Sequence, residues 1–88
     1  MNETKVLEVK TALSTNILNL RKKQGFSQLK LAEMIGKSVK TVNEIETGKS
    51  WPDHSTIQLL SKALAVEETD LFNDPNMVST LNYLRNNK

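Results

Sequence analysis

The stretch from residue 21 to residue 48 constrains the fold of this chain more than any other. It contains two short segments, 28–35 and 39–47, in which apolar residues recur at the spacings of one helix face. A serine precedes each segment, and serine is favoured there because its hydroxyl accepts a free backbone N–H of the first turn. Gly36 lies between them, where the chain must reverse within a few residues. The sequence therefore predicts two short helices joined by a tight turn.

The rest of the chain also has the periodicity of helices. Apolar residues from Val6 to Leu20 predict a first helix from about Thr4 to Lys23, although it could start near Thr11 behind a loose arm, and residues 5–10 could instead form a short strand. Further helices are expected after Pro52-Asp53, at Glu67–Phe72, and after Asp74-Pro75, where an N-cap residue precedes a proline. We therefore expect an all-α fold.

Composition excludes several classes of protein. Eighty-eight residues allow one domain with a modest core. The chain has no cysteine and a single histidine, so we expect no disulfide, metal site or cofactor. It has no apolar run near the roughly 20 residues of a membrane span and no signal-peptide pattern, so we expect a soluble cytoplasmic protein without membrane contact. It also lacks a nucleophile–base pair and a Gly-rich phosphate loop, so we do not expect an enzyme.

The charge is distributed unevenly. The net charge is only +2, but residues 1–50 carry nine Lys and Arg against five Asp and Glu, whereas residues 51–88 carry three against five. The basic half contains the two short helices. This arrangement is expected of a surface that meets nucleic acid, although an ordinary solvated helical surface explains the charge equally well.

Two short helices joined by a glycine turn form a helix-turn-helix, whose second helix enters the DNA major groove. Here the sequence resembles the phage Cro/repressor-type (XRE-like) helix-turn-helix family, over about residues 14–72. The elements that carry the resemblance are Arg21, Gly25, Ser27-Gln28, Leu31-Ala32, Ile35-Gly36, Ser38, Val42, Ile45-Glu46, Gly48, Pro52, Leu60, Ala63-Leu64 and Val66. The ordered set is specific, above all Glu46-x-Gly48 at the end of the second helix.

The resemblance implies a five-helix lambda-repressor-like DNA-binding domain at residues 14–72. Residues 1–13 would be an N-terminal arm or the start of the first helix, and residues 73–88 an additional C-terminal helix. The family commonly acts as a dimer on a palindromic operator. It also often pairs an arginine of the first helix with the glutamate at the end of the third helix of the domain, which is the second helix of the motif. This implies a structural ion pair between Arg21 and Glu46. Phosphate binding by Arg21 is the alternative.

The outward residues of the segment after Ser38 are expected to meet base edges, while Val42 and Ile45 face the core. Expected base contacts are a thymine methyl for Val39, guanine for Lys40, adenine for Asn43 and cytosine for Glu44. Phosphate contacts are expected from Gln28, Lys37, Ser38, Thr41, Lys49 and Ser50. Any of these could instead be a solvated surface residue. Trp51 could stack on the sugar-phosphate backbone or cover the core.

The apolar stripe of the C-terminal helix is the expected dimer interface. Its candidates are Met77, Val78, Leu81 and Leu84. This helix could instead fold back on its own domain. We expect a transcriptional regulator, most simply a repressor, whose partners are double-stranded DNA and a second copy of the chain. The alternatives are an antitoxin that also holds a toxin or another regulator protein, and an interaction adaptor that has lost DNA binding.

Overall fold

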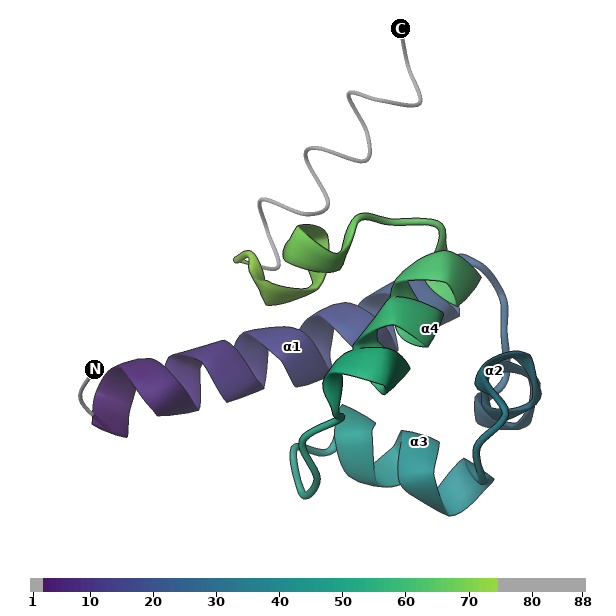
Figure 1. Ribbon diagram of the computed structural model, residues 1–88, viewed down its shortest axis with the longest axis horizontal. Coiled ribbons are helices and arrows are strands. Elements are labelled where there is room, and N and C mark those ends of the chain that lie inside the picture. The colour runs from purple at the N-terminus through teal and green to yellow at the C-terminus, as the bar shows by residue number, and fades with distance from the viewer. Residues whose placement is uncertain (1–2, 75–88) are drawn as a thin grey trace, which may run out of the picture.

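A computed structural model describes residues 3–74, with side chains from residue 11 onward. It contains four α-helices and a short 3-10 helix (Figure 1). They are α1 (Glu3–Lys23), α2 (Gln28–Ile35), α3 (Val39–Glu46), α4 (His54–Leu64) and η1 (Glu68–Phe72). All regular elements in this part of the chain are helical, which confirms the all-α prediction. The expected C-terminal helix, with Met77, Val78, Leu81 and Leu84, lies outside the described residues.

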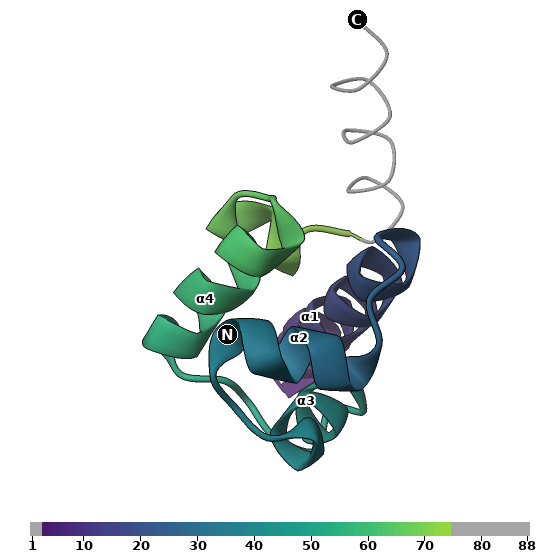
Figure 2. The ribbon, with the colours of Figure 1, turned by 90° about the vertical axis from the view of Figure 1, so that its right-hand side faces the viewer.

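The long helix α1 organises the domain. It contacts α3, α4 and η1, and α2 packs against α3 and α4. Figure 1 shows α1 crossing the molecule, with α3 below it and α2 at one end, and the turned view of Figure 2 shows α2 above α3. The two short helices of the motif therefore pack on the rest of the domain, α3 against α1 and α2 against α4.

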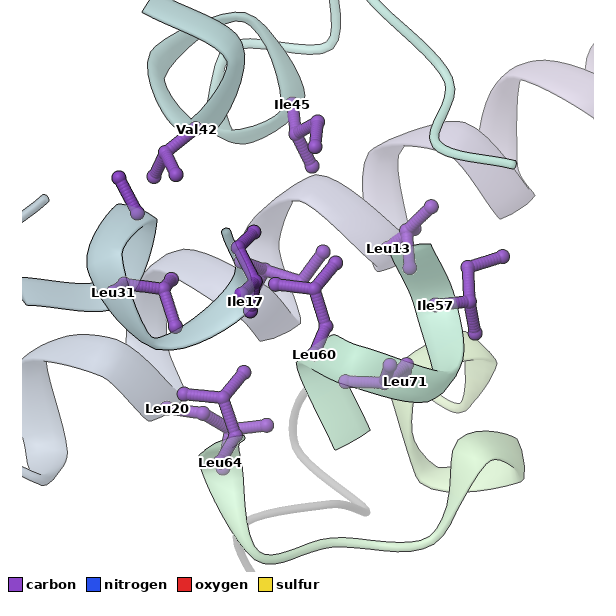
Figure 3. Packing of buried hydrophobic residues seen from close by; sticks show 12 residues of the cluster. Leu13, Ile17, Leu20, Leu31, Val42, Ile45, Ile57, Leu60, Leu64 and Leu71 are labelled. Atoms are coloured by element: carbon purple, nitrogen blue, oxygen red, sulfur yellow. The ribbon is translucent and has the colours of Figure 1, made fainter. Parts of the chain in front are cut away.

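The core lies where these helices meet, and every element contributes to it (Figure 3). Its buried members are Leu13, Ile17, Leu20, Leu31, Ala32, Ile35, Val42, Ile45, Ile57, Leu60, Leu64 and Leu71. Full burial of one such Leu or Ile side chain contributes about 1.5–3 kcal/mol relative to its exposure. In α2 the buried residues are Leu31, Ala32 and Ile35, whereas Leu29 is 57% exposed.

The N-terminal part of the chain is helical from Glu3. Of the two starts considered for the first helix, the structure has the earlier one, and residues 5–10 are helix and not strand. α1 ends at Lys23 because Gly25 adopts a φ of 76°, a left-handed conformation that glycine enters without penalty.

The fifth helix is present as a 3-10 helix. A short helix was expected over Glu67–Phe72, and residues Glu68–Phe72 form one, of the 3-10 type. The N–H of Asp70 donates to the carbonyl of Glu67 at 3.0 Å, a bond three residues apart. The Asn16 amide of α1 donates to the carbonyls of Leu71 and Asn73, at 2.9 and 2.8 Å. These two hydrogen bonds tie the end of η1 to α1.

Helix α4 begins at His54 with Asp53 as its N-cap. One carboxylate oxygen of Asp53 accepts the N–H of Thr56 at 2.9 Å and the hydroxyl of Ser55 at 3.0 Å. Hydrogen bonds from the side chain and the backbone of Thr56, and then from Ser55, lower the pKa of Asp53 to about 2. Asp53 therefore stabilises the fold when its carboxylate is charged.

This cap predicts a dependence of stability on pH. The pKa of Asp53 is lower in the folded protein than in the unfolded chain, so its contribution is present above about pH 4 and is lost as the pH falls through about 2. Asp53→Asn keeps a capping oxygen but cannot titrate. Thermal melts between about pH 2 and pH 5, the range that spans both pKa values, should show a smaller loss of stability on acidification for Asp53→Asn than for wild type. Parallel pH profiles would contradict this role.

Candidate nucleic-acid interface

The two helices of the motif are bounded by local hydrogen bonds. The Ser27 hydroxyl accepts the N–H of Lys30 at 2.9 Å, and the Ser38 hydroxyl accepts that of Thr41 at 3.1 Å, so both predicted caps are present. α2 ends where Gly36 adopts a φ of 70°. This left-handed residue reverses the chain two residues before Ser38, the N-cap of α3. As a result, α3 packs against α2.

Helix α3 has an inward and an outward side. Val42, Ile45 and Glu46 are buried. On the outward side, Val39 is 38% exposed and the Lys40 side chain is 86% exposed. Of the other two candidates for base contact, Asn43 is exposed and Glu44 is half-buried. The Lys40 ammonium lies 3.9 Å from a Glu44 carboxylate oxygen, one turn farther along the helix. The structure thus groups the four candidates on the side of α3 that faces away from the core.

The candidates for phosphate contact surround this surface. Lys37, Ser38 and Lys49 are exposed, and Thr41 and Ser50 are half-buried. The Ser38 and Thr41 hydroxyls are bonded to each other at 3.0 Å. Their hydrogen bond orients both groups at the start of α3.

Gln28 has a structural partner that the sequence did not indicate. Its amide nitrogen donates to Oε1 of Glu46 at 3.0 Å. A carboxylate only accepts hydrogen bonds, so the nitrogen of the amide must face Glu46. One of its two N–H groups is used there, which leaves the other for the expected phosphate contact. Gln28 therefore connects the first turn of α2 to the last turn of α3.

Arg21 and Glu46 form a buried two-point ion pair. The arginine Nε lies 2.6 Å from Oε2, and Nη2 donates to Oε1 at 3.0 Å. Nη1 donates to the carbonyl of Phe26 at 2.8 Å. The two residues are 9% and 7% exposed. Of the two roles considered for Arg21, the structure has the ion pair, which joins α1 to the end of α3 and to the loop before α2.

Asn16 is a structural residue that the sequence interpretation missed. It is 2% exposed, and it binds η1 through the carbonyls described above. A signal was present, because Asn16 lies three residues after Leu13 and four before Leu20, on the apolar face of α1. A polar side chain on such a face must find partners in the interior.

Trp51 follows the loop after α3. Its ring packs on Phe72 with the ring centroids 6.1 Å apart and the planes tilted by 32°. Phe72 in turn packs against the core. Trp51 therefore makes the expected packing contact, but it remains 43% exposed, so stacking on the sugar-phosphate backbone stays a prediction. His54 is exposed and lies 3.0 Å from a carboxylate oxygen of Glu68.

Two kinds of feature are absent from the described residues. Within residues 3–74, no group of three or more His, Cys, Asp or Glu side chains is placed to hold a metal ion. None of the helices in that range has both the length and the apolar character needed to cross a membrane.

Comparison with known proteins identifies the motif. The chain matches the helix-turn-helix family over residues 17–71. Among solved structures, the hypothetical transcription factor NHTF from Neisseria is 25% identical with a TM-score of 0.77, over 85% of this chain and 84% of that one. The clp gene regulator ClgR from Corynebacterium glutamicum shares the fold, with 19% identity and a TM-score of 0.72, over 89% and 83% of the two chains.

No curated protein matches the sequence. The family match covers more than half of the chain and includes α2, the turn at Gly36 and α3. Both structural matches extend over most of the two chains compared. The chain therefore belongs to the Cro/repressor-type helix-turn-helix family.

Proposed function

We propose that this protein is a sequence-specific transcriptional repressor that binds a palindromic DNA operator as a homodimer. It acts by binding and not by catalysis, and it needs no cofactor. The observation that carries the proposal is the two-sided character of α3, whose inward side is buried while Val39, Lys40 and Asn43 remain exposed. Membership of the helix-turn-helix family supports DNA as the partner, and the two structural relatives are described as a transcription factor and a gene regulator.

The outward side of α3 is proposed to lie in the major groove. There, Lys40 donates to guanine, Asn43 bonds to adenine, and Val39 packs on a thymine methyl. Phosphates on either side are bound by Gln28, Lys37, Ser38, Thr41, Lys49 and Ser50, which surround the same surface. The base contacts set specificity, whereas the phosphate contacts set affinity and its dependence on salt.

A dimer is proposed because one α3 reads only about one half-site. Two copies supply two half-sites about 34 Å apart, one turn of the double helix. The proposed interface is the C-terminal stripe of Met77, Val78, Leu81 and Leu84, which lies outside the described residues.

Selection of binding sites from a random duplex library tests this function. We expect enrichment of a palindrome at near-physiological salt. Lys40→Ala and Asn43→Ala should each lower the preference for the favoured base at one position of each half-site, by about 1–3 kcal/mol. Lys62→Ala is the matched control, because Lys62 is an exposed lysine of α4 outside the proposed interface.

The outcome is decisive in either direction. A folded protein that enriches no sequence would contradict the repressor proposal. It would favour the adaptor, or an antitoxin that needs its toxin in order to bind DNA. An enriched site without two-fold symmetry would retain the DNA-binding function and contradict the dimer.

A further inference from the structure

Glu44 occupies an unusual place on the outward side of α3. Among the candidates for base and phosphate contact, it is the one acid. The backbone of Glu44 is fixed by hydrogen bonds, because its carbonyl oxygen accepts the N–H groups of Lys49 and Ser50 at 2.9 and 3.1 Å. The Thr47 hydroxyl lies 3.3 Å from the same oxygen. The backbone at Glu44 is therefore tied to the loop after α3, and its side chain starts from a defined point.

The stability of the helix does not account for a glutamate at this position. Glu44 lies in the last turn of α3, where the negative end of the helix dipole disfavours an acid. Its ion pair with Lys40 is long, at 3.9 Å, and the lysine is 86% exposed. The order lysine then glutamate is also the weaker arrangement for residues four apart on a helix. Such an exposed pair contributes little to folding.

In a major groove, this carboxylate can be satisfied by only two groups. Carboxylate oxygens only accept hydrogen bonds, and the groove offers donors only at the amino groups of cytosine and adenine. Guanine O6 and N7, thymine O4 and the phosphates all present negative charge to Glu44. The neighbouring Lys40 has the opposite preference, because it only donates and therefore favours guanine.

We propose that Glu44 is a specificity-determining residue that rejects guanine or thymine, and accepts cytosine or adenine, at the base that it faces beside the guanine bound by Lys40. The inference rests on the proposed function. Glu44 lowers the affinity for wrong and non-specific DNA more than it raises the affinity for the correct site. Specificity thus comes from a penalty on incorrect partners as well as from favourable contacts.

Glu44→Gln tests this role, because it keeps the size of the side chain and removes the charge. Dissociation constants are measured for the duplex selected by wild type, for its single-base variants and for a shuffled duplex. We expect the variant to bind the shuffled duplex several-fold more tightly and to lose about tenfold in the ratio of specific to shuffled affinity. The preference should fall at one position of each half-site, where wild type favours cytosine or adenine over guanine or thymine on one strand.

Glu33→Gln is the matched control. Glu33 is exposed on α2 and lies outside the proposed interface, so its replacement changes net charge equally and should shift both affinities by the same factor. Thermal melts should show Glu44→Gln at least as stable as wild type. An unchanged base preference, or equal weakening on both duplexes, would overturn the role of Glu44. Failure of wild type to enrich any site would instead overturn the proposed function, and this inference with it.

Discussion

Replacing Glu46 by alanine is expected to lower the free energy of unfolding by about 3–5 kcal/mol, because it leaves a buried guanidinium without its carboxylate. The Arg21 and Glu46 side chains are 11% and 2% exposed, so water cannot easily replace the lost partner. Both carboxylate oxygens are used, one by the arginine alone and the other by Arg21 and Gln28 together. In a domain of this size the loss corresponds to a fall in melting temperature of about 12 °C or more.

The same substitution should weaken DNA binding. Glu46 joins the end of α3 to Arg21 of α1, and it accepts a hydrogen bond from the Gln28 amide at the start of α2. Its loss therefore disturbs both helices of the motif. Urea denaturation followed by circular dichroism measures the stability, and titration of the selected duplex measures the affinity. Lost binding with unchanged stability would contradict the structural role of the ion pair.

Two further variants separate the causes. Glu33→Ala removes an exposed acid from α2 and should change the free energy of unfolding by less than about 0.5 kcal/mol. The double replacement Arg21→Met with Glu46→Leu removes both charges together and should recover much of the stability lost by Glu46→Ala. If the double variant is less stable than Glu46→Ala, a stranded charge is not the reason for the loss.

The bounds of α2 and α3 could be predicted because their signals are local. Ser27 and Ser38 bond to N–H groups three residues away, and Gly36 needs only its own left-handed conformation. The residues of α3 that face the core, Val42 and Ile45, could be predicted from the spacing of apolar residues along a helix. Spacing alone does not decide which of Leu29 and Leu31 is buried, because that depends on how α2 rotates against the other helices.

Features that depend on distant parts of the chain were not predictable. Asn16 binds carbonyls 55 and 57 residues away, so no nearby pattern identifies its partners. α4 ends at Leu64, and the next residue, Ala65, has a φ of 57°, a left-handed conformation for which glycine is usual, so the sequence carried no glycine stop signal there. In the interface, the link between Gln28 and Glu46 joins the two ends of the motif and appears only once the helices are packed. The pairing of Arg21 with Glu46 came from family resemblance and not from spacing.

Asn16→Asp is expected to cost about 3–5 kcal/mol of stability, although it preserves the shape of the side chain. The amide nitrogen donates to carbonyl oxygens at 2.8 and 2.9 Å, and a third lies at 3.4 Å. The substitution would place a second acceptor, with a negative charge, against these oxygens in a buried site. Asn16→Ala removes the donors without adding a charge and should cost less, about 1–3 kcal/mol.

The Asn16→Asp variant also carries a pH test that the alanine variant lacks. Burial against carbonyl oxygens should raise the pKa of the introduced carboxyl above its unfolded value, because its protonated form can donate one hydrogen bond. The stability deficit of Asn16→Asp relative to Asn16→Ala should therefore shrink as the pH falls below that pKa. The control is Asn19→Asp, at an exposed position on α1, which should show neither the loss nor this pH dependence.

The local effect can be followed through Trp51, the single tryptophan of the chain. Its ring packs on Phe72, the last residue of η1, so release of η1 from Asn16 should change the tryptophan emission along with the global melt. If Asn16→Asp matches Asn19→Asp in stability and in emission, the amide of Asn16 does not hold η1 against α1. If the deficit appears and shrinks on acidification, the hydrogen bonds from Asn16 hold η1 against α1.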